Sequence, residues 1–247
     1  FIPRAGKLPA FFDYLGSGLR HIQAVLTELS PDIVHFQSTS WWAKYCKFPN
    51  VLSVHGIAEV DTRLKADGFG NKLNSWIVAA TEGRARGLVE NVIAISDYTR
   101  TQVVGCKNVA LIYNPISPAY FEIEGKKDPK RVLVAGMITP LKNTLGVVRA
   151  VKELATRGCE VELRVAGWGV ESPYGQKCVE EAKTIAAPAS VTFLGGLGFE
   201  EYKAELESAE LLVLASRQEN APMVISEAMA ANTAVLASAV GGVPEMV

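Results

Sequence analysis

The chain has 247 residues, of which 49% are apolar, and it carries 25 basic and 26 acidic residues. This length is enough for one large or two ordinary α/β domains. The near-zero net charge argues against a nucleic-acid-binding protein, and no apolar run approaches the roughly 20 residues that span a bilayer. Four cysteines without CxxC spacing favour reduced thiols over a disulfide or zinc framework. No signal peptide is recognisable from Phe1 onward, so we expect a cytoplasmic protein without a transmembrane segment.

The first half of the chain alternates between helical and strand patterns. Helical periodicity predicts one helix over residues 11–29 and another over 61–90, the second interrupted by a GFG sequence at 68–70. Nearly continuous apolar runs of the parallel-sheet type predict strands at 32–36, 51–55, 92–95 and 109–112. This alternation indicates a doubly wound α/β domain, which we assign to residues 1–116. Asn114-Pro115 and the charged run 122–130 predict a hinge, and we assign residues 117–130 as the linker.

A second α/β series is predicted over residues 131–247. Its strands are expected at 131–135, 161–166, 191–194, 211–215 and 234–237. Helices are expected near 143–157, 174–186, 199–208 and 222–231. Five strands with four intervening helices favour a single parallel sheet with right-handed connections.

A pair of carboxylates stands out near the end of this second series. Glu219 follows an apolar strand, Pro222 is expected at the first helical position, and Glu227 lies one to two turns into the helix. Both carboxylates can then face one cavity at the positive helix N-terminus, where free N–H groups near Met223 and Val224 suit anionic oxygens. The alternative is that the two glutamates are ordinary solvated residues.

Further candidates lie at other strand ends. Lys142 stands just before a predicted helix with Asn143 as its N-cap, which adds a cation to an anion site, although exposed lysines are common there. Small residues at Gly136 and Gly167 can let a nucleotide approach the sheet edge. The sequence Gly167-Trp168-Gly169 and the glycines at 195, 196 and 198 can equally be ordinary turns.

The remaining candidates lie in the first half of the chain. His55 ends a strand and is either a functional group or a satisfied structural histidine, whereas His21 and His35 are interpreted as structural. Trp41 and Trp42 can form an aromatic platform for an acceptor or simply pack. Ser96 and Arg100 are interpreted as the cap and first turn of a helix.

The ENAP-x4-EAMA string from Glu219, with the apolar strand and the GGVPE turn that follow it, resembles the donor-binding signature of group 1 glycosyltransferases. That large retaining family has the GT-B fold. The resemblance implies two Rossmann-like doubly wound domains that face each other across a cleft. It also implies that the first domain is incomplete here, because the family's glycine-rich N-terminal strand and loop, and its closing C-terminal elements, are not found in this chain. We therefore expect an exposed sheet flank that a homo-oligomer can cover.

The resemblance implies transfer of a sugar from a nucleotide diphosphate sugar to a hydroxyl of a saccharide or lipid-linked acceptor, with retention. Peripheral membrane contact is compatible with such an acceptor. The donor is a substrate, and no cofactor or metal is expected. A binding module without turnover is an alternative, because Met137 stands where family members often have an arginine. A Rossmann dehydrogenase is disfavoured, because no GxGxxG with a following acidic residue follows a strand.

The family also implies the role of each site residue. Glu219 holds hydroxyls of the transferred sugar, Glu227 the ribose, and Lys142 the leaving diphosphate. His55 stabilises the transition state. Donor contacts are further assigned to the loop and helix start that follow Glu219 and to two strand ends, namely Asn220, Ala221, Pro222, Met223, Val224, Gly136 and Gly167.

Overall fold

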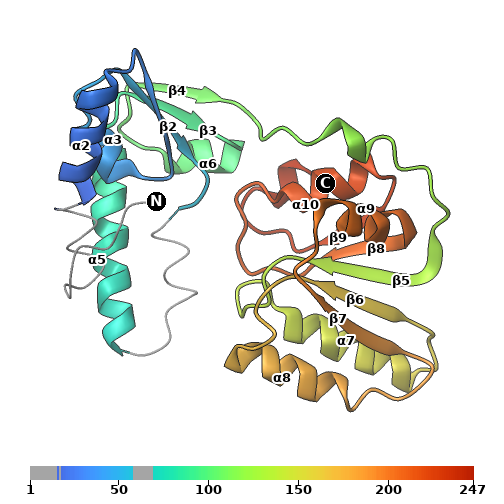
Figure 1. The fold of residues 1–247 in the computed structure, drawn as a ribbon. Helices are drawn as coiled ribbons and strands as arrows, with labels where there is room; N and C mark the ends of the chain where they lie inside the picture. The colour runs from blue at the N-terminus through green and yellow to red at the C-terminus, as the bar shows by residue number, and fades with distance from the viewer. Residues whose placement is uncertain (1–15, 17, 58–68) are drawn as a thin grey trace. The chain divides into compact units, whose positions relative to one another are not determined.

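The computed structural model describes residues 16, 18–57 and 69–247 of the chain. These fall into two compact units, Phe1–Tyr113 and Asn114–Val247, each with its own parallel sheet (Figure 1). The helix predictions at residues 11–15, 17 and 61–68 lie outside the described residues.

The sheet of the first unit has four parallel strands in the order β1-β2-β3-β4. They are β1 (Val34–Gln37), β2 (Asn50–Val54), β3 (Asn91–Ala94) and β4 (Asn108–Leu111). Helix α2 (Gly18–Leu29) precedes β1, and the helices between the strands are α3 (Ser40–Tyr45), α5 (Phe69–Arg86) and α6 (Asp97–Gln102). All four predicted strands are confirmed, and within the described residues β1 and β4 are the edges of this sheet.

Two helical features of this unit differ from expectation. The long helix over 61–90 is shorter, because α5 ends at Arg86. Helix α3 was not predicted, and it contains the tryptophan pair. Its first N–H groups, those of Ser40 and Trp41, donate to the buried carboxylate of Glu82 at 2.8 and 3.3 Å. This cap comes from α5, so the helix depends on a distant contact rather than on its own sequence.

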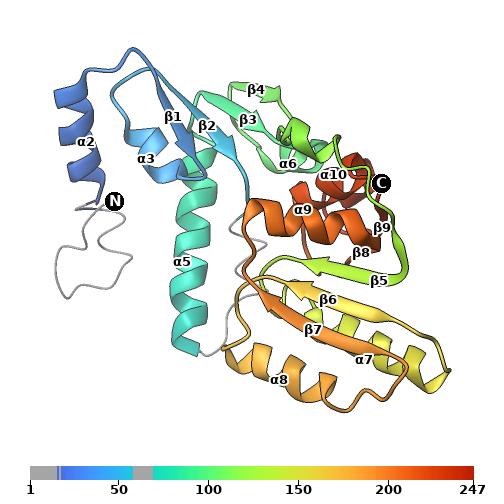
Figure 2. The same ribbon diagram turned by 45° about the vertical axis from the view of Figure 1, so that its right-hand side comes forward.

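The sheet of the second unit has five parallel strands in the order β7-β6-β5-β8-β9 (Figure 2). They are β5 (Asp128–Ala135), β6 (Glu162–Ala166), β7 (Ser190–Gly195), β8 (Ala209–Leu214) and β9 (Ala234–Ala237). The helices are α7 (Thr144–Thr156), α8 (Pro173–Ala182), α9 (Phe199–Ser208) and α10 (Met223–Ala230). These five strands and four helices confirm the predicted series.

Helices cover both faces of this second sheet. Figure 1 shows α9 and α10 on one face and α7 and α8 on the other. Leu206 and Ile225 pack with Leu212 in one core, while Val148 and Cys178 pack with Val165 in the other. Both sheet faces are therefore buried, which explains the continuous apolar runs in the central strands β5 and β8.

The segment expected as a linker, 117–130, is part of the second unit. It contains a 3₁₀ turn, η2 (Pro118–Tyr120), and the first residues of β5. The side chains of Tyr120 and Ile123 are buried in the core against α9 and α10. Lys127 donates hydrogen bonds of 2.7 and 2.8 Å to the carbonyls of Leu206 and Ala231, so its ammonium caps the carboxyl ends of both helices. The unit begins at Asn114, before the expected boundary at residue 117. A second 3₁₀ turn, η3 (Val243–Glu245), lies near the end of the chain.

Candidate functional site

The strand order of the second unit creates a switch point beside β5. The chain proceeds from β5 to β6 and β7 on one side, and it continues with β8 and β9 on the other. In open parallel sheets, ligands bind at the carboxyl ends of the two strands where this reversal occurs. The loops that follow β5 and β8 at this edge carry Lys142 and Glu219.

Lys142 and Glu219 form an ion pair across the switch point, with 2.5 Å between Nζ and Oε1. The Ser216 hydroxyl donates to the same carboxylate oxygen at 2.6 Å. A backbone hydrogen bond of 2.8 Å from Arg217 N–H to the Leu141 carbonyl joins the two loops. Glu219 is only 9% exposed, so its charge is held in place by these partners rather than by bulk water. The structure thus brings together two residues that are 77 positions apart.

The predicted helix caps are corrected in two places. Pro222 is the N-cap of α10 and not its first residue, because its ψ of 109° is still extended. Asn143 stands at the N-cap of α7, but its φ of 55° is left-handed and its side chain makes no capping hydrogen bond. Instead the Tyr174 hydroxyl accepts the Leu145 N–H at 3.0 Å. The donor-site candidates Asn220 to Val224 lie in the loop before α10 and in its first turn.

Glu227 lies one turn into α10 and has a different environment from Glu219. Burial raises the pKa of this carboxyl, and its interaction with the Tyr202 hydroxyl partly opposes that increase. Burial, and then the charge of Glu227, likewise raise the pKa of Tyr120 and Tyr202. The aromatic rings of Tyr120 and Tyr202 meet edge to face at 6.2 Å. No described contact joins Glu227 to Glu219, so a cavity shared by both carboxylates stays a prediction.

The raised pKa of Glu227 predicts an unusual pH dependence of stability. The folded protein binds the proton of the Glu227 carboxyl more tightly than the unfolded chain does. The free energy of unfolding therefore falls as the pH rises from 4.5, the ordinary pKa of a glutamate, through the raised pKa of Glu227. Glu227→Gln removes the penalty for the charged form, and we expect the variant to be the more stable protein at neutral pH. Thermal unfolding between pH 4 and 8 measures this. Glu181→Gln is the control. Lys152 and Arg149 lower the pKa of Glu181, so removal of this carboxylate is expected to destabilise the folded protein at neutral pH.

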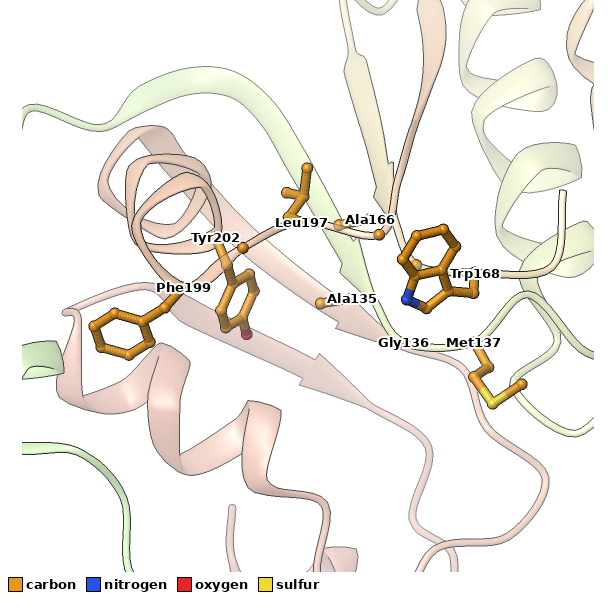
Figure 3. Close-up of a pocket in the computed structure, with 11 residues that line it drawn as sticks. Ala135, Gly136, Met137, Ala166, Trp168, Leu197, Phe199 and Tyr202 are labelled. Carbon is orange, nitrogen blue, oxygen red and sulfur yellow. The ribbon is translucent and has the colours of Figure 1, made fainter. Parts of the chain in front are cut away.

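A pocket of about 350 Å³ opens at the carboxyl ends of β5, β6 and β7 (Figure 3). It is lined by residues 135–137, 166–168 and 196–199 together with Tyr202. The candidates Gly136 and Gly167 both lie in its wall, with φ angles of 142° and 151° that L side chains rarely adopt. A Cβ on Gly136 would lie 3.8 Å from Cε of Lys142, so the lysine stem is adjacent to the pocket. Trp168, Phe199 and Tyr202 were not among the predicted site residues.

His55 lies in the first unit, directly after β2. Its Nε2 is 2.5 Å from Oε1 of Gln37, whose amide nitrogen is 3.2 Å from Nε2 of His35. Ser53 Oγ is 2.8 Å from the same His35 nitrogen. The amide of Gln37 therefore links the two histidines, so His35 belongs to the surroundings of His55. The role of His55 in transfer remains a prediction.

Trp41, Trp42 and Ser96 make contacts within the first unit, and an acceptor platform at the tryptophan pair stays a prediction. Trp41 meets Tyr45 edge to face at 4.6 Å within α3, and Trp42 packs against the core of the unit. Ser96 is the N-cap of α6 as predicted, since its hydroxyl accepts the Thr99 N–H at 3.0 Å.

Over residues 18–57 and 69–247, no helix is long and apolar enough to cross a membrane. The same part of the chain contains no cluster of three or more His, Cys, Asp or Glu arranged for a metal ion.

Comparison with known proteins identifies related sequences and folds. A D-inositol 3-phosphate glycosyltransferase of Mycobacterium bovis is 34% identical over 96% of this chain and 53% of its own length. An uncharacterized glycosyltransferase of Methanocaldococcus jannaschii is 27% identical over 82% of this chain and 54% of its own. The chain thus spans about half the length of the curated relatives that it matches. The structure of Anabaena HepE in complex with UDP-glucose superposes with a TM-score of 0.69 at 19% identity, over 97% of this chain and 67% of that one.

The structural likeness establishes the GT-B class of fold that the sequence predicted. Two family models cover the chain. Residues 3–120 match the model described as Glycosyltransferase Family 4. Residues 117–247, more than half of the chain, match the model described as Glycosyl transferases group 1. The chain therefore belongs to the group 1 glycosyl transferases.

Proposed function

We propose that the protein transfers a sugar from a nucleotide diphosphate sugar to an acceptor hydroxyl, with retention at the anomeric carbon. The Lys142–Glu219 ion pair, held at the switch point beside a pocket, is the observation that carries this proposal. In the reaction, the bond from the anomeric carbon to the diphosphate oxygen breaks and the acceptor oxygen bonds to that carbon. The acceptor hydroxyl gives up its proton to the departing diphosphate oxygen, so that charge and protons balance.

The ion pair suits this chemistry because it offers a cation to the leaving diphosphate and a carboxylate to the hydroxyls of the transferred sugar. The Lys142 ammonium has three N–H donors and can hold Glu219 and a diphosphate oxygen together, which offsets the charge that develops on the leaving group. The Glu219 carboxylate accepts hydrogen bonds from sugar hydroxyls and orients the sugar relative to that group. Glycosyltransfer by relatives, and the UDP-glucose in the HepE structure, support a nucleotide-sugar donor.

The protein as a binding module without turnover is the second candidate. Met137, 60% exposed at the pocket, stands in place of the arginine that is common in the family, so the diphosphate has one cation fewer at that position. Incubation of the protein and a nucleotide sugar with a panel of saccharide and lipid-linked acceptors separates the two candidates. Donor binding without any glycosylated product favours the binding module.

Replacement of Glu227 by glutamine tests the donor side of the proposal. If Glu227 accepts hydrogen bonds from the ribose, Glu227→Gln weakens nucleotide binding by about tenfold to a hundredfold, because a charge-assisted bond contributes about 1.5–3 kcal/mol. Titration calorimetry with nucleoside diphosphates measures this change. Glu153→Gln is the matched control, since it makes the same chemical change on the exposed side of α7, where Glu153 pairs with Arg157. Equal affinity of wild type and Glu227→Gln would remove Glu227 from the donor site.

A further inference from the structure

The neighbouring strands β1 and β2 carry a line of polar side chains on one face of the first sheet (Figure 2). Gln37 pairs in register with Ser53, so His35 and Gln37 of β1 share a face with Ser53 and with His55, which directly follows β2. The residues that alternate with them are buried apolar residues of the core, namely Phe36, Leu52 and Val54. Packing therefore accounts for one face of these strands but not for the polar line on the other.

Hydrogen bonds connect these polar side chains in a row. Oε1 of Gln37 lies 2.5 Å from Nε2 of His55, and the amide nitrogen of Gln37 lies 3.2 Å from Nε2 of His35. The Ser53 hydroxyl is 2.8 Å from the same His35 nitrogen. The backbone N–H of His55 donates to the Ser38 hydroxyl at 3.0 Å, and the Ser38 N–H donates to the Ser53 carbonyl at 2.9 Å. Both the ring and the backbone of His55 are thus attached to the end of β1.

The Gln37 amide determines where each histidine carries its proton. The oxygen of an amide only accepts hydrogen bonds, and its nitrogen only donates them. Because Oε1 faces His55, Nε2 of His55 is the donor and carries a proton. Because the amide nitrogen faces His35, Nε2 of His35 is the acceptor, and the neutral His35 ring carries its proton on Nδ1. One amide therefore requires opposite tautomers on the two histidines.

We propose that Gln37 is a positioning residue for the transfer reaction, because its amide holds His55 as the Nε2–H tautomer and places the lone pair of the neutral ring on Nδ1. His35 and Ser53 support this arrangement, since the contact with Nε2 of His35 fixes the direction of the amide. The inference rests on the proposed function, because it states how His55 is prepared for the reaction.

The two tautomers can be observed directly. The chain contains three histidines, so a two-bond ¹H–¹⁵N correlation spectrum contains three ring systems, which single His→Gln variants assign. At about pH 9, above the range in which imidazole gains its charge, we expect Nε2–H for His55 and Nδ1–H for His35. His21, an exposed residue of α2, gives the reference for an ordinary ring. The reverse pattern, or the same tautomer on His35 and His55, overturns the proposal.

Two substitutions of Gln37 separate its two contacts. Gln37→Met keeps the length of the side chain but removes both hydrogen bonds, so the His55 signals are expected to shift toward those of His21. Gln37→Glu keeps an oxygen acceptor for His55 but has no N–H for His35. In this variant His55 should keep its tautomer, while His35 changes to Nε2–H. His55 signals that are the same in Gln37→Met and wild type would refute the role of the amide.

Turnover connects the tautomer to the proposed function. Gln37→Met is expected to lower kcat about tenfold, the effect of losing one orienting hydrogen bond, while the affinity for a nucleoside diphosphate stays within a few-fold of wild type. Gln37→Glu should recover much of this loss. Gln102→Met is the matched control, because it makes the same change on the exposed helix α6 and should leave kcat unchanged.

The failure of this inference is distinguishable from the failure of the proposed function. A wild-type kcat in Gln37→Met refutes the positioning role and leaves the proposed transfer reaction standing. If the wild-type protein forms no glycosylated product with any acceptor of the panel, the proposed function fails and the positioning role fails with it, whatever tautomers the spectra show.

Discussion

Replacement of Glu219 by glutamine is expected to lower kcat by about 100- to 1,000-fold, the effect of removing one positioned electrostatic group from an active site. The change keeps the shape of the side chain but removes its charge. Lys142 then loses its partner at 2.5 Å, and Ser216 donates to an amide instead of a carboxylate. Affinity for a free nucleoside diphosphate should remain within a few-fold of wild type, because Glu219 is assigned to the sugar. Steady-state kinetics and calorimetry on the same variant measure both quantities.

Two further variants make this experiment specific. Ser216→Ala removes one hydrogen bond to the carboxylate but leaves its charge and its ion pair, so a smaller loss of about tenfold is expected, close to the contribution of one hydrogen bond to a charged group. Glu227→Gln should show the reverse pattern, with nucleotide affinity reduced. If Glu219→Gln and Glu227→Gln weaken free nucleotide binding equally, the assignment of one carboxylate to the sugar and the other to the ribose is wrong.

The strands could be predicted from sequence because both faces of each sheet in this fold are covered. Residues such as Leu133 and Leu212 are fully buried, and the runs that contain them are apolar at nearly every position. The 117–130 segment lacks such a run. Tyr120 lies beside the exposed Phe121, and Ile123 lies between two glutamates, so only the structure shows that Tyr120 and Ile123 fill the core against α9 and α10. Helix α3 is similar, because its cap, Glu82, is 42 residues from Ser40.

The residues of the site could be chosen from the sequence, but the contacts between them could not be predicted from it. Lys142 and Glu219 could each be chosen from their positions after strands, but no local pattern shows that two residues 77 positions apart form an ion pair. Trp168 was visible between two glycines, yet no local pattern shows that its indole lies against Gly196, which follows another strand. The environment of Glu227 was also hidden, because the tyrosines around it come from η2 and α9.

Gly167→Ala is expected to produce the largest loss of stability among substitutions in the second unit that we consider. A Cβ at this position would lie 1.8 Å from the carbonyl oxygen of Gly136 and 2.6 Å from its carbonyl carbon. Both atoms belong to the backbone at the end of β5, so no rotation of a side chain relieves the clash. The φ of 151° adds strain of about 1–3 kcal/mol, and overpacking adds a similar amount. The sum is a large part of the roughly 5–15 kcal/mol that stabilises a typical domain.

Gly158→Ala separates the two causes of this loss. Gly158 follows α7 with a φ of 76°, but a Cβ there meets no atom within 4 Å, so the variant is subject only to backbone strain of about 1–2 kcal/mol. Urea denaturation followed by far-UV circular dichroism should therefore rank wild type, Gly158→Ala and Gly167→Ala in order of decreasing midpoint. Equal midpoints for the two variants would mean that the ends of β5 and β6 can move apart. Because Gly136 and Gly167 both line the pocket, such movement would also widen that pocket. Tight packing of these two glycines is thus the condition on which both the stability of the sheet edge and the shape of the pocket depend.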